Sequence, residues 1–369
     1  MKVLVNILFL ASALSVLFTS CEQDPDPNDP IKIADKTFSN ALFNSVLDEN
    51  GDLLIIDTDG NHNISYAEAE VVTYMNLGNQ GISDLTGIEA FINLEYLHCF
   101  QNELQELDIS ENRALVGLSC WRNSLSTLDV SSLADLEFLD CGFNELSVLD
   151  VSMNEALLML HCSRNKITAL DVSQNLLLIG LYCSFNQLTE LDVSGNTALI
   201  SLMCESNQLS NLVVTTNTEL KVLACTNCLL SSLDLSNNPD LSILNCGENQ
   251  LLTLDLSNNR ALVNLYCSNN QLSTLNISSN SKLVDLYCSH NQLSSIYTSS
   301  KIFLRHLYCG YNQITSLDIS RSYDLWILDV TEMPTLTEVC VWEMPFPPEH
   351  VLVNAGGSPN TYFTDMCSK

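Results

Sequence analysis

Leucine and cysteine recur along most of this chain with a period of 21 residues. A leucine stands five residues before each of eleven regularly spaced cysteines, and a second leucine stands two residues before. The cysteines are Cys99, Cys120, Cys141, Cys162, Cys183, Cys204, Cys225, Cys246, Cys267, Cys288 and Cys309. A period of 20–50 residues predicts stacked coils that share one continuous core. We therefore expect one short parallel strand per coil, with neighbouring coils about 4.8 Å apart.

The rest of the repeat is polar and also regular. Three residues after the cysteine stands Asn in ten of the eleven repeats, and Cys228 in the other one. This Asn is expected to turn the chain and to bond with backbone groups that would otherwise be buried and unpaired. The second half of the repeat reads mostly Leu-Asp-(Leu/Val/Ile)-Ser, as in residues 107–110. We expect it to form a second extended segment on the opposite side of the coil.

This pattern resembles the leucine-rich repeat, L-x-x-L-x-L-x-x-N/C-x-L, with Cys in the third Leu position. Its short second half is similar to the bacterial class of 21-residue repeats called IRREKO. The resemblance covers about residues 72–342 and implies a leucine-rich-repeat solenoid, a parallel β-rich right-handed superhelix of about 13 coils. We expect the solenoid to span residues 72–338. The tail, residues 339–369, holds four prolines and is expected to cap the stack.

The fifteen cysteines divide into groups with different expected states. The eleven in the repeat occupy a buried Leu position, where free Cys behaves as a small hydrophobic residue. Zinc sites gather a few ligands at short spacings, unlike one Cys per coil. We therefore predict free, buried thiols there. Cys340 and Cys367 lie outside the repeat and flank the tail, where a disulfide would tie down the end of the stack.

The N-terminal segment indicates export. Residues 1–20 have a basic start, an apolar stretch and small residues near the end, as a secretory signal peptide does. Residues 17–21 resemble the lipobox of bacterial lipoproteins, which implies lipidation of Cys21. Residues 21–30 then form an acidic tether, similar to the surface-export signal of some Gram-negative lipoproteins. We expect an outer membrane lipoprotein, exposed at the cell surface; the alternative is ordinary signal cleavage with a free Cys21.

Residues 57–68, DTDGNHNISYAE, match the EF-hand loop, with His62 in the place of its glycine. The resemblance implies a Ca²⁺ site within a small helical cap, residues 31–71. Its implied ligands are Asp57, Asp59, Asn61, Asn63, Ser65 and Glu68. The helical spacing of residues 37–47 predicts the entering helix. The alternative is a polar turn into a helix, since residues 65–68 also form a capping box.

Charge and motifs narrow the function. The chain has 44 acidic and 14 basic side chains, a net charge of −30, and such a surface repels nucleic acid. An apolar content of 46% excludes disorder for the bulk of the chain. The nucleophile-elbow, zinc-protease, dinucleotide-binding and P-loop motifs are absent from the sequence. The Asp that follows Leu recurs once per coil, which indicates a turn-forming carboxylate. We therefore predict no enzyme.

The non-repeating positions beside each cysteine should face the exposed concave side of the solenoid. Aromatic and His residues gather there in two patches, one in the first five coils and one in the last three. The first patch includes Phe138, His161 and Tyr182. The second includes Tyr266, Tyr287, Tyr308, His306, His290 and Tyr311. Exposed aromatic residues serve protein interfaces and glycan sites, and they also simply favour strands. We predict an adhesin-like binding face for a protein partner; the alternatives are a glycan-binding accessory protein and a structural spacer.

Overall fold

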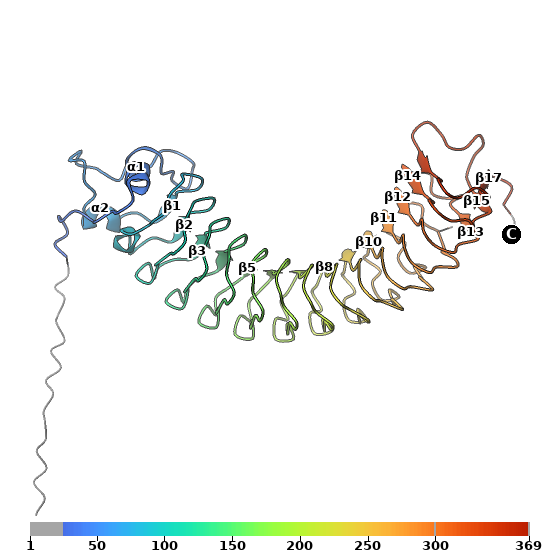
Figure 1. Ribbon diagram of the computed structural model, residues 1–369, viewed down its shortest axis with the longest axis horizontal. Coiled ribbons are helices and arrows are strands. Elements are labelled where there is room, and N and C mark those ends of the chain that lie inside the picture. Colours follow the sequence, from blue (N-terminus) through green and yellow to red (C-terminus); the bar gives the residue numbers. More distant parts are fainter. Residues whose placement is uncertain (1–24, 299, 368–369) are drawn as a thin grey trace, which may run out of the picture.

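The chain folds into a curved solenoid (Figure 1), which the computed structural model describes for residues 25–298 and 300–367. The predicted signal peptide and Cys21 lie outside the described residues. Fourteen short strands, each of three residues, form one parallel sheet along the inner side of the arc. They are β1 (Tyr74–Asn76), β2 (Tyr96–His98), β3 (Gly117–Ser119), β4 (Phe138–Asp140), β5 (Met159–His161), β6 (Gly180–Tyr182), β7 (Ser201–Met203), β8 (Val222–Ala224), β9 (Ile243–Asn245), β10 (Asn264–Tyr266), β11 (Asp285–Tyr287), β12 (His306–Tyr308), β14 (Ile327–Asp329) and β16 (Leu352–Asn354).

The register of this sheet brings equal repeat positions side by side. In β10 and β11, for example, Leu265 pairs with Leu286 and Tyr266 pairs with Tyr287. Because side chains alternate across a strand, the middle residue of each strand points into the core and its two neighbours point to the concave surface. The predicted leucine-rich-repeat solenoid is therefore confirmed. Surface side chains at the same repeat position lie next to one another and form a row along the sheet.

The core is a continuous stack of Leu and Cys. All eleven repeat cysteines have no exposed surface and are free thiols, as is the nearly buried Cys228. Burial raises the pKa of ten of these thiols, to about 12 for Cys162, and at Cys204 a hydrogen bond with Cys228 and burial together raise it. The prediction of buried, unpaired thiols is confirmed for the cysteine ladder.

Two ladders of asparagine hold the turns. In the predicted ladder, Asn165 Nδ2 donates to the carbonyls of Cys141 and Cys162 at 3.1 and 3.0 Å, and its Oδ1 accepts from the backbone N–H of Leu146. A second ladder of asparagines, not predicted from the sequence, lies on the outer side. There Asn175 is fully buried and donates to the carbonyls of Val151 and Asn154 at 2.9 and 2.8 Å. Its members are Asn112, Asn154, Asn175, Asn196, Asn217, Asn238, Asn259 and Asn280.

In some coils another residue replaces the Asn of the second ladder. Leu133 occupies one of its positions, and Lys301 occupies another near the C-terminal end. Lys301 is fully buried by surface area, and its Nζ donates to the carbonyls of Ile277 and Asn280 at 2.5 and 3.1 Å. Burial lowers the pKa of Lys301. The long side chain thus reaches the same two carbonyl positions that an Asn binds in the preceding coils.

The expected second extended segment is paired into a sheet in only a few coils. Asp171 Oδ1 accepts from the backbone N–H of Ser173 at 2.9 Å, and this Asp-based turn recurs along the solenoid. On this side the described residues form a sheet only near the C-terminal end, apart from one isolated bridge between Asp255 and Asn276. That sheet contains β13 (Ser316–Asp318), β15 (Glu338–Cys340) and β17 (Tyr362–Thr364).

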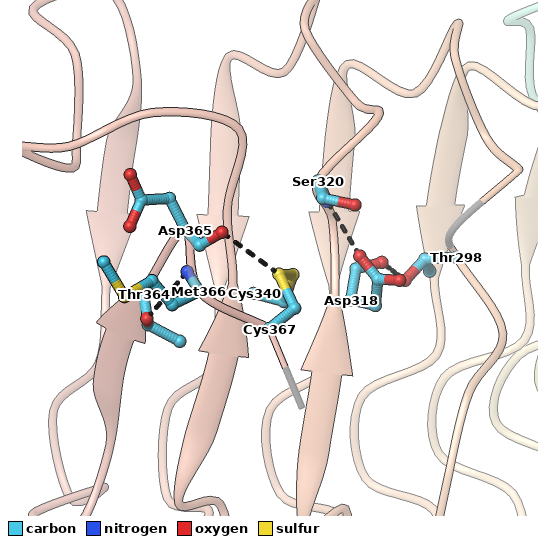
Figure 2. Close-up of a disulfide and its surroundings, with 8 residues drawn as sticks. All are labelled: Thr298, Asp318, Ser320, Cys340, Thr364, Asp365, Met366 and Cys367. Atoms are coloured by element: carbon cyan, nitrogen blue, oxygen red, sulfur yellow. Dashed lines mark hydrogen bonds between the residues drawn. A yellow bond between two sulfur atoms is a disulfide. The ribbon is translucent and has the colours of Figure 1, made fainter. Parts of the chain in front are cut away.

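Each end of the solenoid has its own closure. At the N-terminal end lie α1 (Lys36–Asn44), α2 (Tyr66–Glu70) and the short 3-10 helix η1 (Ile88–Ala90). At the C-terminal end a disulfide joins Cys340 and Cys367, with Cα atoms 5.4 Å apart (Figure 2). The tail does more than cover the stack, because β16 and β17 extend the two sheets. The inner sheet consequently has 14 strands where about 13 coils were expected.

Candidate functional site

Part of the concave sheet is hollowed. The hollow has a volume of about 680 Å³ and lies over β2 to β6. Its lining consists of Tyr96, His98, Gly117, Leu118, Ser119, Phe138, Leu139, Asp140, Met159, His161 and Tyr182. Phe138, His161 and Tyr182 of the first predicted patch therefore come together on one concave surface.

Two glycines make room for the large side chains around the hollow. A Cβ on Gly117 would lie 2.6 Å from the Tyr96 ring, and a Cβ on Gly180 would lie 2.6 Å from Met159 Sδ. The larger side chains from neighbouring strands thus lean over positions that have none. This packing role of Gly117 and Gly180 was not predicted from the sequence.

The polar groups of the hollow are few and are held in place. His161 Nδ1 lies 3.2 Å from Asp140 Oδ1, and the His161 ring meets Tyr182 edge-on at 5.8 Å between ring centres. Burial lowers the pKa of His98, which is half-buried and therefore tends to stay neutral. An apolar surface with a small number of oriented polar groups is typical of a binding site.

Aromatic rings continue along the loop that follows the strands. Phe100 and Trp121 stack with ring centres 5.5 Å apart and an interplanar angle of 12°. Further along, the Arg164 guanidinium lies 5.1 Å from the centre of the Phe143 ring and 4.0 Å from that of Phe185. The hollow therefore has a cationic and aromatic border on one side.

The second predicted patch is built differently, as a row of three tyrosines and two separate pairs of side chains. Tyr287 lies between Tyr266 and Tyr308, with ring centres 4.8 and 4.4 Å away. Burial and the neighbouring hydroxyls raise the pKa of Tyr287 to about 12. His306 Nδ1 is 2.6 Å from Asp285 Oδ1, and in the loop His290 stacks on Tyr311 at 4.0 Å. The predicted residues thus form rows of mutual contacts, and their rings largely face one another.

The acidic loop of the N-terminal cap brings three of its predicted ligands together. Carboxylate oxygens of Asp57, Asp59 and Glu68 lie within 4.8 Å of one another. The side chain of Asn61 donates to Asp59 and accepts from the backbone N–H of Asn63. His62 has the left-handed φ of 65° that the glycine of the motif normally supplies.

Glu68 is held in place by the start of helix α2. Its Oε1 accepts from the backbone N–H of Thr58 at 2.8 Å, and its Oε2 accepts from that of Ser65 at 2.9 Å. Burial raises the pKa of Glu68, but these hydrogen bonds outweigh it and lower the pKa to about 2. Ser65 also accepts from the Glu68 backbone, so the capping box that the sequence offered as an alternative is present. The capping box of helix α2 does not exclude a bound cation, because a carboxylate oxygen of Glu68 can accept a hydrogen bond and bind a metal ion at the same time.

The functional domain of InlJ from Listeria monocytogenes, which includes a cysteine ladder, is similar to this chain. The two are 30% identical with a TM-score of 0.65, over 75% of this chain and 70% of that one. This chain is a leucine-rich-repeat protein.

Other leucine-rich-repeat proteins share its fold at lower identity. An internalin, inlF, of L. monocytogenes is 19% identical with a TM-score of 0.69, covering 91% of this chain and 96% of that one. The leucine-rich effector YopM from Yersinia pestis is 24% identical with a TM-score of 0.62, covering 80% and 86%. No protein-family model matches the chain, and none of the curated proteins compared with it matches in sequence. Within the described residues, the helices of this leucine-rich-repeat protein are too short or too polar to span a membrane.

Proposed function

We propose that this leucine-rich-repeat protein is an adhesin-like binding protein of the cell surface that holds a partner protein on its concave face. The observation that carries this proposal is the apolar hollow over β2 to β6, with Leu118, Leu139 and Met159 beneath a rim of aromatic and His side chains. Buried pockets that accept an apolar or aromatic anchor supply most of the free energy of typical protein interfaces. The repeating acidic turns provide no unique catalytic constellation, so we propose binding rather than catalysis.

The exposed rings favour a protein over a glycan. A sugar ring stacks on a free aromatic face, yet both faces of Tyr287 are covered by Tyr266 and Tyr308. One face of Trp121 is likewise covered by Phe100. The hollow itself is mostly apolar, which suits an aliphatic or aromatic side chain better than a hydroxyl-rich sugar.

Removing the apolar lining should weaken binding strongly without unfolding the protein. A phage-displayed library of random 12-residue peptides, panned on the purified full chain, supplies the probe. We expect the Phe138→Ser/Met159→Ser variant to bind the selected peptides at least about 30 times more weakly, because even a single hot-spot residue contributes about 2 kcal/mol or more. Affinities are measured by surface plasmon resonance, and melting temperatures show that the fold is kept.

The matched control removes two rings from the other patch. A Tyr266→Ser/Tyr287→Ser variant should keep the affinity for the selected peptides. The opposite result, with only the tyrosine variant losing affinity, would move the site to β10–β12. A glycan array run with the same protein tests the alternative ligand class, and strong array binding without selected peptides would favour a glycan.

We also propose that the loop of residues 57–68 binds Ca²⁺ as a structural ion. Asp57, Asp59 and Glu68 offer three converging carboxylates, and hard oxygen ligands of this kind suit Ca²⁺. The left-handed His62 gives the chain the turn that the loop requires. A bound ion would link the loop of residues 57–63 to helix α2. It would thereby stabilise the N-terminal end of the solenoid.

Calcium should raise the melting temperature of the wild type and leave an Asp57→Asn/Asp59→Asn variant unchanged. At a Ca²⁺ concentration 100 times the Kd, binding adds about 2.7 kcal/mol to the free energy of unfolding. The control Asp171→Asn removes a carboxylate from a solenoid turn and should retain the calcium effect. Absence of both calorimetric heat and a melting shift at millimolar Ca²⁺ would refute the site.

We propose, finally, that Cys21 is lipidated and that residues 22–30 form the tether to an outer membrane. Support for the lipidation comes from the sequence alone. Residues 25–30 belong to the described structure, and the carbonyls of Pro27 and Asp29 accept hydrogen bonds from the backbone N–H groups of Ala67 and Tyr66, so the end of the predicted tether packs against helix α2. In detergent phase partitioning, wild type expressed in a Gram-negative host should enter the detergent phase and Cys21→Ala the aqueous phase. Partition of both forms into the aqueous phase would contradict the anchor, and protease shaving of intact cells tests surface display.

A further inference from the structure

The loop after each strand of the inner sheet contains a residue with left-handed backbone. This position has φ between 51° and 58° from Asn79 to Tyr311. Asn adopts this conformation more readily than bulky residues do, and Asn227 and Asn269 are examples. In the coils beside the hollow the position holds Arg122, Phe143, Arg164 and Phe185 instead. The backbone does not require Arg and Phe here, so their side chains call for another explanation.

Arg164 is positioned by its two neighbours in this row. Its guanidinium lies between the Phe143 and Phe185 rings, 5.1 and 4.0 Å from their centres, while the residue itself is exposed. Rings on both sides restrict the guanidinium by cation–π contact and leave its N–H groups free at the edge. A guanidinium fixed in this way can form two parallel hydrogen bonds to one carboxylate.

The protein supplies Arg164 with no carboxylate of its own. Among the described residues, the Lys and Arg ion pairs are Arg113 with Glu111 and Lys166 with Glu145, both on the surface. Neither Arg122 nor Arg164 forms an ion pair or a side-chain hydrogen bond within residues 25–298 and 300–367. In a chain with 44 acidic and 14 basic side chains, an oriented arginine without an acidic partner is unexpected.

The arginine and the hollow adjoin one another. Gly142 precedes Phe143 directly, and a Cβ on Gly142 would lie 3.4 Å from both His161 Nε2 and Asp140 Oδ1 of the hollow lining. Gly142 thus lies between the hollow and Phe143, the ring that contacts Arg164. A ligand group in the hollow would be close to the Arg164 side chain. Three extended residues of a partner span about 10 Å, which is sufficient to contact both.

We infer that Arg164 binds an aspartate or glutamate side chain of the partner protein, close in sequence to the apolar residue that fills the hollow. This inference rests on the proposed function, because it names the chemistry of the segment that the concave face would hold. The net charge of −30 favours a partner of positive overall charge at long range. Arg164, with Arg122 two coils away, selects a carboxylate locally.

The peptides selected on the full chain test this inference. We expect them to carry Asp or Glu within about three residues of an aromatic or aliphatic residue. Arg164→Gln should weaken their binding about 10-fold or more, since charge-assisted bidentate hydrogen bonds are among the strong ones. Arg164→Lys should recover only part of the affinity. Arg260→Gln removes the same charge from an exposed outer turn and should change nothing.

The outcomes separate the two proposals. Peptides that lose affinity on Phe138→Ser/Met159→Ser, but lack acidic residues and tolerate Arg164→Gln, overturn the carboxylate site and leave the hollow as a binding site. If the peptides bind the Phe138→Ser/Met159→Ser and Arg164→Gln variants with unchanged affinity, the proposed function and this inference are both overturned. A library that yields no binder has the same consequence. Panning on Arg164→Glu should select basic residues instead of acidic ones; unchanged selection of acidic residues would also overturn it.

Discussion

Raising the pH from 7 to 10 should unfold the solenoid cooperatively. The eleven ladder thiols stay protonated in the folded protein because burial raises their pKa, to about 12 at Cys99, Cys162, Cys246 and Cys309. In the unfolded chain the same thiols ionise near pH 8.5. Each thiol therefore costs the folded state nothing below about pH 8.5 and about 2 kcal/mol by pH 10. The losses from eleven thiols together exceed the free energy of unfolding of a typical domain, about 5–15 kcal/mol.

Circular dichroism melting curves at a series of pH values, under nitrogen to prevent oxidation, measure this effect. A Cys141→Ala/Cys162→Ala/Cys183→Ala variant provides the control. It should be less stable at pH 7, because it leaves cavities, yet its melting temperature should fall less steeply with pH since three ionising groups are gone. Equal slopes for the two proteins would show that the ladder thiols do not cause the alkaline unfolding.

A carboxylate placed within the ladder should also destabilise the solenoid strongly at neutral pH. Cys162 has no exposed surface, and a fully buried carboxyl has its pKa raised by about 3–5 units. At about 1.4 kcal/mol per unit, Cys162→Asp should lose about 4 kcal/mol at pH 7, because pH 7 lies only about 3 units above the pKa of Asp in the unfolded chain. The loss is largest above the folded pKa and disappears below about pH 4, where the unfolded chain is protonated as well.

Two comparisons isolate the buried charge. Cys162→Ala removes the thiol without adding a charge, and Gln174→Asp adds the same carboxylate to an exposed turn of the same coil. Chemical denaturation at pH 7 and pH 4 should show a large deficit for Cys162→Asp at the higher pH alone. If Cys162→Asp matched Cys162→Ala at both pH values, water would have to reach the core.

The repeat spacing was sufficient to predict the sheet, its register and the core. A buried position that recurs every 21 residues must be stacked on its equivalent in the next coil, so Cys162 could be placed beside Cys141 and Cys183 from the sequence alone. The position of Cys340 and Cys367 around the tail likewise suggested the bond that the structure contains. The stacking of Tyr266, Tyr287 and Tyr308 followed from their equal repeat position.

The shape of the surface could not be predicted in the same way. The shape of the hollow depends on the directions that the Tyr96 and Met159 side chains take over Gly117 and Gly180. The 21-residue period gives the position of each residue but not the conformation of its side chain. The placement of Arg164 between two rings likewise depends on side-chain directions around a left-handed loop residue. By contrast, the second asparagine ladder had a sequence signal, an Asn at one further repeat position, and could have been found by inspecting every column of the repeat.

The disulfide between Cys340 and Cys367 also affects how the molecule responds to mechanical force. Coils of a solenoid contact only their neighbours, so tension applied at a terminus removes the outermost coil first and then proceeds inward. The bond joins the C-terminal end of the chain to β15, so a pull on that end bypasses β16 and β17 and acts directly on a coil that lies further inside. The end of the stack is consequently protected from unzipping strand by strand, and it has to yield as one unit.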